Sequence, residues 1–135
     1  MTFDEMVALQ HKPKLRRKPQ SQEHQLQCMC VNWFRWQHPQ LKHILFAVPN
    51  GSKRDVVTAR RLKDEGATAG VADLILLKSN RFYGALCIEM KTPKGRQQES
   101  QKLWQQEVEA NGAKYIVCRS LDEFIAATNN YLADV

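Results

Sequence analysis

The stretch from Gly70 to Lys91, GVADLILLKSNRFYGALCIEMK, constrains the fold more than any other part of this 135-residue chain. Its first run, residues 71–77, is apolar except for Asp73, which is typical of a strand that is covered on both faces. A lone carboxylate in such a strand is costly unless a cation compensates it. We therefore expect Asp73 to lie beside a positive charge or a metal ion.

The second run, residues 85–91, alternates in polarity. Because strand side chains repeat with a period of two, Glu89 and Lys91 are expected on one face and the large apolar residues on the other. Residues 78–81, between the two runs, are polar and favour a turn. The two strands are therefore predicted to pair as an antiparallel hairpin, which would bring Asp73 close to Glu89 and Lys91.

Two carboxylates beside an ammonium group indicate a site for phosphodiester hydrolysis. Hard divalent cations take oxygen ligands and are commonly held by one or two carboxylates plus substrate phosphate oxygens, so Asp73 and Glu89 would suffice for Mg²⁺ or Mn²⁺. A bound metal lowers the pKa of a coordinated water, and Lys91 could orient or help deprotonate that water. The alternative is a structural Glu–Lys pair with Asp73 capping a turn, because the triplet E-x-K often arises by chance.

Around these residues the chain resembles the VRR-NUC (virus-type replication-repair nuclease) branch of the PD-(D/E)XK nucleases. The motifs that carry the resemblance are, in chain order, Val48-Pro49-Asn50-Gly51, Arg54, Lys63-Asp64-Glu65-Gly66, Gly70, Asp73, Glu89-Met90-Lys91, Gln101 and Trp104. The resemblance extends from about residue 21 to the C-terminus. The chain departs from the family at Ala72, where a proline often stands; this bears on the local backbone and leaves the predicted ligand in place.

The resemblance assigns roles to individual residues. It implies catalytic roles for Asp73, Glu89, Lys91 and Gln101, and metal ligation by Asp73, Glu89 and the backbone carbonyl of Met90. In this family a glutamate on the first helix reaches the metal, often through water, and that role falls on Glu23. Without the resemblance, Glu23 is explained equally well as an acid favoured by the dipole near a helix N-terminus.

The formal net charge of +6 favours a polyanionic partner, since phosphate backbones attract basic surfaces regardless of sequence. The residues predicted to contact DNA are Lys53, Arg54, Arg60, Lys94 and Arg96. Arg54, which matches a family position, is the preferred contact. The alternative for the others is an ordinary solvated surface. The basic run in residues 12–18 could be an arm on DNA or a solvated tail.

Length and composition predict one globular domain, 21–135, preceded by a basic, flexible arm, 1–20. No apolar run approaches the roughly 20 residues of a membrane helix, and the N-terminus lacks the features of a secretory signal. We therefore expect a cytoplasmic protein with no membrane partner and no organic cofactor; the family's distribution suggests a bacterium or a phage-infected cell. The cysteines are expected to be free, small, buried residues; they are Cys28, Cys30, Cys87 and Cys118.

The order of the predicted elements indicates an α/β fold, a mixed β-sheet flanked by helices of the restriction-endonuclease-like type. The expected elements are a helix from residue 21, a strand at 43–48, a helix at 55–65, the two strands described above, a helix at 99–111, a strand at 115–118 and a last helix after Ser120. The expected function is a metal-dependent DNA endonuclease, and the resemblance implies a homodimer that would suit branched DNA such as four-way junctions. These residues do not separate a junction resolvase from a flap or nicking endonuclease or from a general DNA nuclease. The alternatives are a non-catalytic DNA-binding protein and an RNA nuclease.

Overall fold

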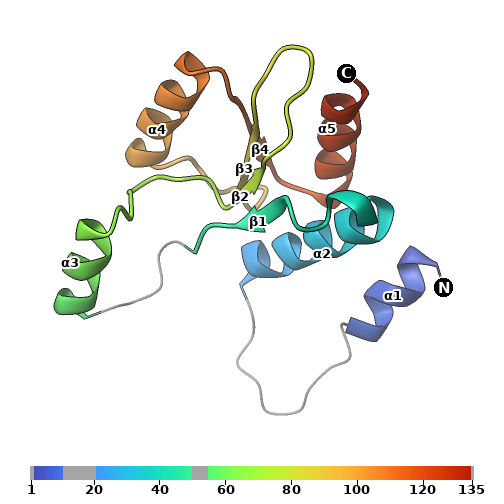
Figure 1. Cartoon of the computed structure of the whole chain (residues 1–135). Helices are drawn as coiled ribbons and strands as arrows, with labels where there is room; N and C mark the ends of the chain where they lie inside the picture. The colour runs from blue at the N-terminus through green and yellow to red at the C-terminus, as the bar shows by residue number, and fades with distance from the viewer. Residues whose placement is uncertain (1, 11–20, 50–54, 135) are drawn as a thin grey trace, which may run out of the picture.

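A computed structural model of the chain describes residues 2–10, 21–49 and 55–134. In it a mixed sheet lies at the centre and helices cover both of its faces (Figure 1). The elements are α1 (Phe3–Gln10), α2 (Gln22–Gln37), the 3-10 turn η1 (Pro39–Leu41), β1 (Leu45–Ala47), α3 (Val56–Asp64), β2 (Leu74–Leu76), β3 (Leu86–Met90), α4 (Glu99–Ala110), β4 (Lys114–Cys118) and α5 (Leu121–Ala133).

The four strands lie in the order β1-β2-β3-β4. β2 is antiparallel to both β1 and β3, whereas β4 runs parallel to β3. The predicted hairpin and the predicted mixed α/β sheet are therefore confirmed. β2 is shorter than the predicted strand 71–77, because the side chain of Asp73 accepts the hydrogen bond of the Met90 N–H, which ends the backbone ladder between β2 and β3. β1 is likewise shorter than the predicted strand 43–48.

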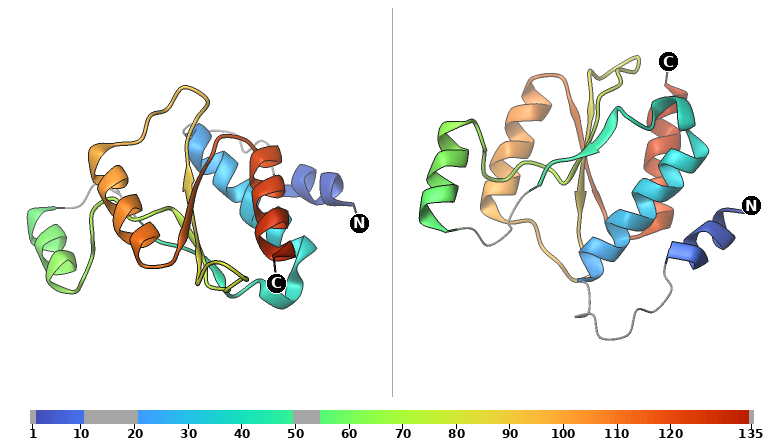
Figure 2. Two further views of the ribbon diagram at one scale, coloured as in Figure 1. Left: turned by 90° about the horizontal axis from the view of Figure 1, so that it is seen from above. Right: turned by 60° about the horizontal axis from the view of Figure 1, so that its bottom comes forward.

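One face of the sheet carries the large core. Helices α2 and α5 cover this face, and α4 covers the other, as two further views show (Figure 2). The apolar side of β3 faces α2 and α5, as its alternation predicts. The buried residues of this cluster are Cys30, Trp33, Phe34, Leu45, Leu74, Leu76, Leu86, Ile88, Met90, Cys118, Phe124 and Tyr131.

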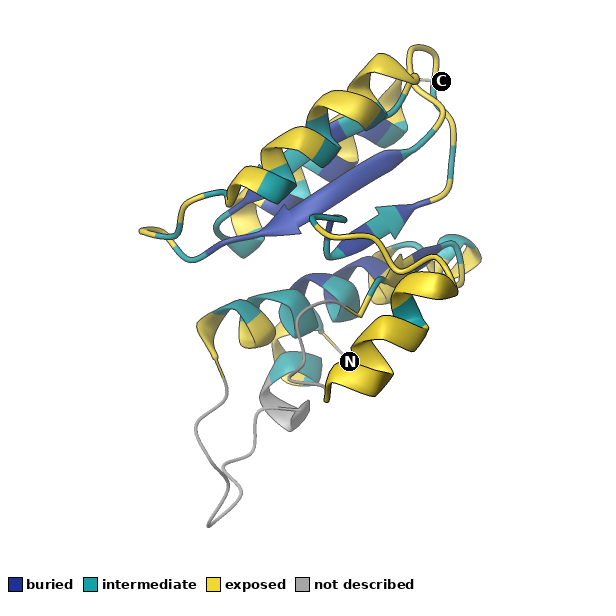
Figure 3. Ribbon diagram, turned by 90° about the vertical axis from the view of Figure 1, so that its left-hand side faces the viewer, coloured by how far each residue is buried: buried dark blue, intermediate teal, exposed yellow. Residues whose placement is uncertain are grey.

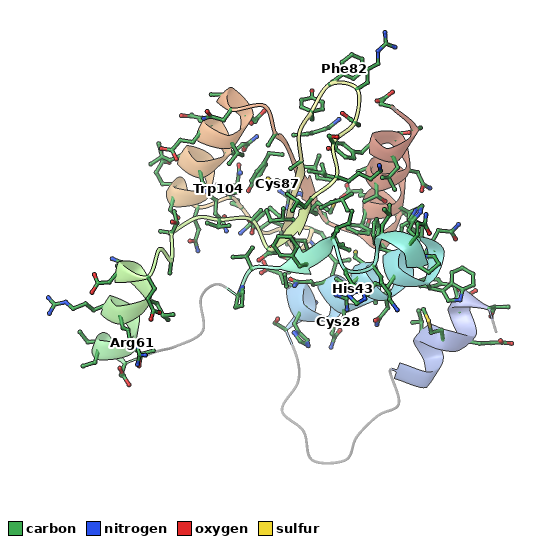
Figure 4. The ribbon with its side chains drawn as sticks, viewed as in Figure 1. Cys28, His43, Arg61, Phe82, Cys87 and Trp104 are labelled. Carbon is green, nitrogen blue, oxygen red and sulfur yellow. The ribbon has the colours of Figure 1, made fainter. Side chains whose placement is uncertain are left out.

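The opposite face of the sheet, under α4, holds a smaller cluster. Ala72, Cys87 and Tyr115 are buried there, and Trp104 packs against them from the helix. Figure 4 shows Trp104 beside Cys87 between α4 and the sheet. β3 is therefore buried on both faces, as the dark blue strand of Figure 3 shows. Any polar side chain that β3 directs toward α4 is enclosed by protein.

Helix α3 stands apart from this body (Figures 1 and 2). None of its residues is buried, and its first two side chains, Val56 and Val57, are 83% and 77% exposed. The helix begins where the Asp55 carboxylate accepts the N–H of Thr58 at 2.7 Å. Its place beside the sheet is thus set by the chain on either side of it and not by a shared core.

The N-terminal region forms a helix over part of the predicted arm 1–20. Thr2 and Glu5 cap α1 reciprocally: the Thr2 N–H donates to the Glu5 carboxylate at 2.9 Å, and the Glu5 N–H donates to the Thr2 hydroxyl at 3.1 Å. The ring of Phe3 lies 6.0 Å from that of Trp36 on α2. The basic run 12–18 lies outside the described residues.

The cysteine prediction is correct for three of the four thiols. Cys30, Cys87 and Cys118 are buried and free, whereas Cys28 is half-buried on α2. Cys28 differs because its side of α2 faces a shallow groove along β1, away from the core. Among the described residues, no helix has the length and apolar character needed to cross a bilayer.

Candidate active site

Asp73 and Glu89 meet on the α4 face of the sheet. Leu74 pairs with Ile88 across the antiparallel strands, so the residues next to this pair, Asp73 and Glu89, are neighbours. The Asp73 carboxyl lies close enough to that of Glu89 to raise the pKa of Glu89. Both line a cleft of about 530 Å³, together with Glu23, Lys91 and Gln101. The fold therefore brings together the side chains that the sequence placed in one site.

Asp73 is held by the backbone of both neighbouring strands. Its Oδ2 accepts the Met90 N–H at 2.7 Å, and its backbone carbonyl accepts the Val48 N–H at 2.9 Å. A carboxylate fixed in this way has little freedom to rotate. The orientation is set before any ligand arrives.

Glu89 is almost fully buried, with 2% of its surface exposed. Its Oε1 accepts a hydrogen bond from the Gln101 amide at 3.0 Å and lies 3.9 Å from the Lys91 ammonium. Burial and, after it, the nearby Asp73 carboxyl raise the pKa of Glu89 to about 8, while Lys91 opposes the shift. Glu89 therefore holds a proton near neutral pH unless a cation takes its place.

Lys91 lies on the same face, two residues beyond Glu89, as the alternation predicts. It is 7% exposed, and its N–H donates to the Cys118 carbonyl at 3.0 Å, which extends the pairing of β3 with β4. The ammonium group is thus carried on a rigid strand at the edge of the cleft. It can approach a phosphate oxygen or a water there without reorganisation of the backbone.

Gln101 is fixed by the first turn of α4. Its Oε1 accepts the Gln98 N–H at 2.8 Å, which directs its amide nitrogen to Glu89. Gly70 allows this turn to approach the loop before β2: a Cβ at Gly70 would lie 2.1 Å from the Ser100 carbonyl oxygen, and its φ is +82°. Only glycine fits such a position without displacing α4.

The donor set of the cleft suits a hard divalent cation. Asp73 and Glu89 offer carboxylate oxygens, Glu23 lines the same cleft from the first turn of α2, and the cleft has room for waters and a phosphate. Among the residues that the structure describes, no three His, Cys, Asp or Glu side chains converge as a complete metal cage. A site of this kind fits Mg²⁺ or Mn²⁺, which keep several waters, better than a closed zinc site.

Comparison with known proteins identifies the family and the fold. The profile of the VRR-NUC domain matches residues 8–122. The chain belongs to the VRR-NUC family. A solved structure named "VRR_NUC domain protein" superposes with a TM-score of 0.74 at 22% sequence identity, covering 87% of this chain and 93% of that one. That likeness shows a shared fold. No curated protein sequence matches the chain.

The basic residues predicted to contact DNA are spread around the VRR-NUC fold. Lys94 and Arg96 are exposed on the loop after β3, and Arg60 is exposed on α3, so none of the three lines the cleft. Lys53 and Arg54 lie outside the described residues. The loop after β3 is held by Arg119, whose guanidinium donates to the carbonyls of Thr92 and Gly95 at 2.8 and 2.6 Å.

The sequence did not single out Tyr115 or Gln97, which also belong to this VRR-NUC site. The Tyr115 hydroxyl lies 3.4 Å from Oε2 of Glu89, and the Gln97 amide donates to that hydroxyl at 3.1 Å. Tyr115 looked like an ordinary member of the strand YIVC. No local sequence pattern indicated this contact, because it depends on the parallel register that pairs Tyr115 with Cys87 and puts its side chain on the polar face of β3.

Proposed function

We propose that this VRR-NUC protein is a Mg²⁺- or Mn²⁺-dependent endonuclease that hydrolyses DNA phosphodiester bonds. The observation that supports it best is that Asp73 and Glu89, neighbours across β2 and β3, both line a cleft that Lys91 also lines. Two acids in contact are costly unless a proton or a cation is shared between them. In a nuclease fold, a divalent cation would offset this cost and could also take part in hydrolysis.

Each residue has a defined part in this proposal. Asp73 and Glu89 would hold the ion, with the Met90 carbonyl as a further ligand and Glu23 acting through water. When bound, such an ion supplies charge neutralisation and a water of lowered pKa. Lys91 would orient the attacking water or stabilise the charge on the phosphate, and Gln101 keeps Oε1 of Glu89 in place.

DNA is the proposed partner because the surface is basic and the family is one of nucleases. Contacts from Lys53, Arg54, Arg60, Lys94 and Arg96 to phosphates would position the duplex without selecting bases. We further propose a homodimer that acts on branched DNA such as a four-way junction, with two sites that cut opposite strands. This finer part rests on the family resemblance.

The experiment that tests the activity is a cleavage assay on labelled linear, flapped and four-way DNA. Reactions contain Mg²⁺, Mn²⁺, Ca²⁺ or a chelator, since Ca²⁺ can support binding without turnover. We expect products with Mg²⁺ or Mn²⁺ alone and their loss in Asp73→Asn. Unchanged nicking by Asp73→Asn would defeat the proposal, and binding without any metal-dependent product would favour a non-catalytic DNA-binding protein.

Two companion measurements address the finer parts. A matching set of RNA substrates in the same assay separates a DNA nuclease from an RNA nuclease. Light scattering of the purified protein, alone and with a four-way junction in Ca²⁺, reports whether two copies assemble on one branched molecule. A monomer that cuts all the DNA forms equally would remove the junction proposal and leave the nuclease proposal intact.

A further inference from the structure

Tyr115 lies directly behind the predicted metal ligand Glu89. It is 7% exposed and lies on β4, which runs parallel to β3, and it pairs with Cys87 two residues before Glu89. The side chains of Tyr115 and Glu89 therefore both point to the α4 face, where the Tyr115 hydroxyl comes within 3.4 Å of Oε2 of Glu89. The tyrosine contacts the carboxylate from within the protein, since it does not line the cleft itself.

Gln97 determines which way the Tyr115 hydroxyl points. The Gln97 amide donates to the hydroxyl oxygen at 3.1 Å and to Oε1 of Gln105 on α4 at 2.8 Å. A phenol has one proton to donate. Since Gln97 approaches the oxygen as a donor, the proton of Tyr115 is directed to the carboxylate of Glu89.

The donors around Glu89 are divided between its two oxygens. A carboxylate has about four acceptor positions, two on each oxygen. Oε1 faces both the Gln101 amide and the Lys91 ammonium, whereas Oε2 faces the Tyr115 hydroxyl. Gln101 and Tyr115 thus hold different oxygens of the same carboxylate, and Tyr115 limits the rotation of Oε2.

We propose that Tyr115, oriented by Gln97, is a positioning residue that holds the Glu89 carboxylate ready to bind a divalent cation. The inference rests on the proposed function. Partners that lie behind a metal ligand fix its orientation, and their removal typically costs about 10- to 100-fold in metal affinity or activity. The 3.4 Å separation is longer than a relaxed O–H···O bond, so we expect the lower end of that range, about tenfold.

The test is calorimetric titration of the full chain with Mn²⁺ alone, which reports binding without turnover. Tyr115→Phe removes one oxygen and keeps the ring, and we expect its Mn²⁺ dissociation constant to rise about tenfold. Tyr131→Phe is the matched control. Its hydroxyl is also enclosed and donates to the Lys78 carbonyl at 2.5 Å, but it belongs to α5 on the opposite side of the sheet. Its dissociation constant should equal that of the wild type.

A second variant keeps the inference falsifiable if Tyr115→Phe folds poorly. Gln97→Met removes the amide that orients the hydroxyl and keeps a side chain of similar length, so its Mn²⁺ affinity should also fall. Because Gln97 acts through Tyr115, the double variant should bind Mn²⁺ no more weakly than Tyr115→Phe does. Additive losses would show that Gln97 does not act through the tyrosine.

Two other outcomes separate this inference from the proposed function. If Asp73→Asn loses Mn²⁺ binding while Tyr115→Phe binds as tightly as the wild type, the positioning role of Tyr115 is wrong and the metal site stands. If the wild type itself binds no Mn²⁺, the proposed function and the positioning role both fail. Circular dichroism of each folded variant accompanies the titrations, so a loss of affinity cannot come from unfolding.

Discussion

The carboxylate of Asp73 takes the place of a backbone acceptor for Met90. The Met90 N–H donates to Oδ2 of Asp73 at 2.7 Å, at the point where the ladder between β2 and β3 ends. The Asp73 side chain therefore ends the backbone pairing of β2 with β3 and also lies beside Glu89. Its structural and chemical roles can be separated by substitution, because an amide oxygen can accept the same bond but carries no charge.

We expect Asp73→Asn to fold with a stability near that of the wild type and Asp73→Ala to be less stable. Alanine leaves the Met90 N–H without its partner, which costs about 1–3 kcal/mol. Both variants lose the charge, so both should lose about 10³-fold or more in metal-dependent cleavage, from several kcal/mol of lost metal-ion catalysis. Urea denaturation and the DNA cleavage assay measure the two effects.

The second prediction concerns pH and the free energy of unfolding without metal. The pKa of Glu89 is raised from about 4.5 to about 8, chiefly by burial and then by Asp73. At a pH between these two values, Glu89 is protonated in the folded protein and ionised in the unfolded chain. The free energy of unfolding should therefore fall as pH rises from about 4.5 to about 8. Thermal unfolding in chelator across this range measures the slope, and Glu89→Gln should reduce it.

Metal binding should show the opposite trend with pH. A cation must displace the proton held at Glu89, so Mn²⁺ affinity should rise up to about pH 8 and then level off. Titration in two buffers of different ionisation enthalpy would show the released proton. An affinity that stays constant from pH 6 to pH 9 would contradict the raised pKa of Glu89.

Period-two alternation was enough to predict that Glu89 and Lys91 share one face of a strand. It put Glu89 and Lys91 on one face of β3 and the large apolar residues on the other, and the turn residues at 78–81 predicted the hairpin that brings Asp73 beside them. These features depend on local geometry, which a sequence pattern records directly. The resemblance added Gln101, which the structure bonds to Glu89.

The remaining features depend on contacts between segments far apart in the chain. Tyr115 contacts Glu89 because β4 pairs in parallel with β3, a register that no local pattern specifies. The early end of β2 follows from a side chain of Asp73 replacing a backbone acceptor. Helix α3 has a well-formed N-terminal cap and a helical pattern of residues. Neither feature reveals that the helix has no buried residue.

The fourth prediction concerns Gly70. Alanine there would meet the Ser100 carbonyl at 2.1 Å and would have to adopt a φ of +82°. Gly112, at the far end of α4, has a φ of +92° and open space around it, so Gly112→Ala is the matched control. The control should lose about 1–2 kcal/mol from its backbone conformation. Gly70→Ala should lose about 1–3 kcal/mol more from overpacking.

Gly70→Ala should also reduce the rate of DNA cleavage by more than its loss of stability explains. Displacement of the first turn of α4 would move Gln101 away from Glu89, so cleavage should fall even at a temperature where the variant is fully folded. Gly112→Ala should cleave at the wild-type rate under the same conditions. Equal activity in the two variants would show that the contact between Gly70 and α4 does not position Gln101.

The last prediction concerns the exposed cations. If Arg60, Lys94 and Arg96 contact phosphates, each alanine substitution should reduce the slope of log binding affinity against log salt concentration by about one. Arg61 is the matched control, because it projects from the same helix as Arg60 (Figure 4) but pairs with Glu65 at 3.5 Å. Its substitution should leave the slope nearly unchanged. Fluorescence anisotropy with labelled DNA in Ca²⁺ measures these slopes, and an equal change in Arg60→Ala and Arg61→Ala would indicate general charge attraction in place of a defined contact.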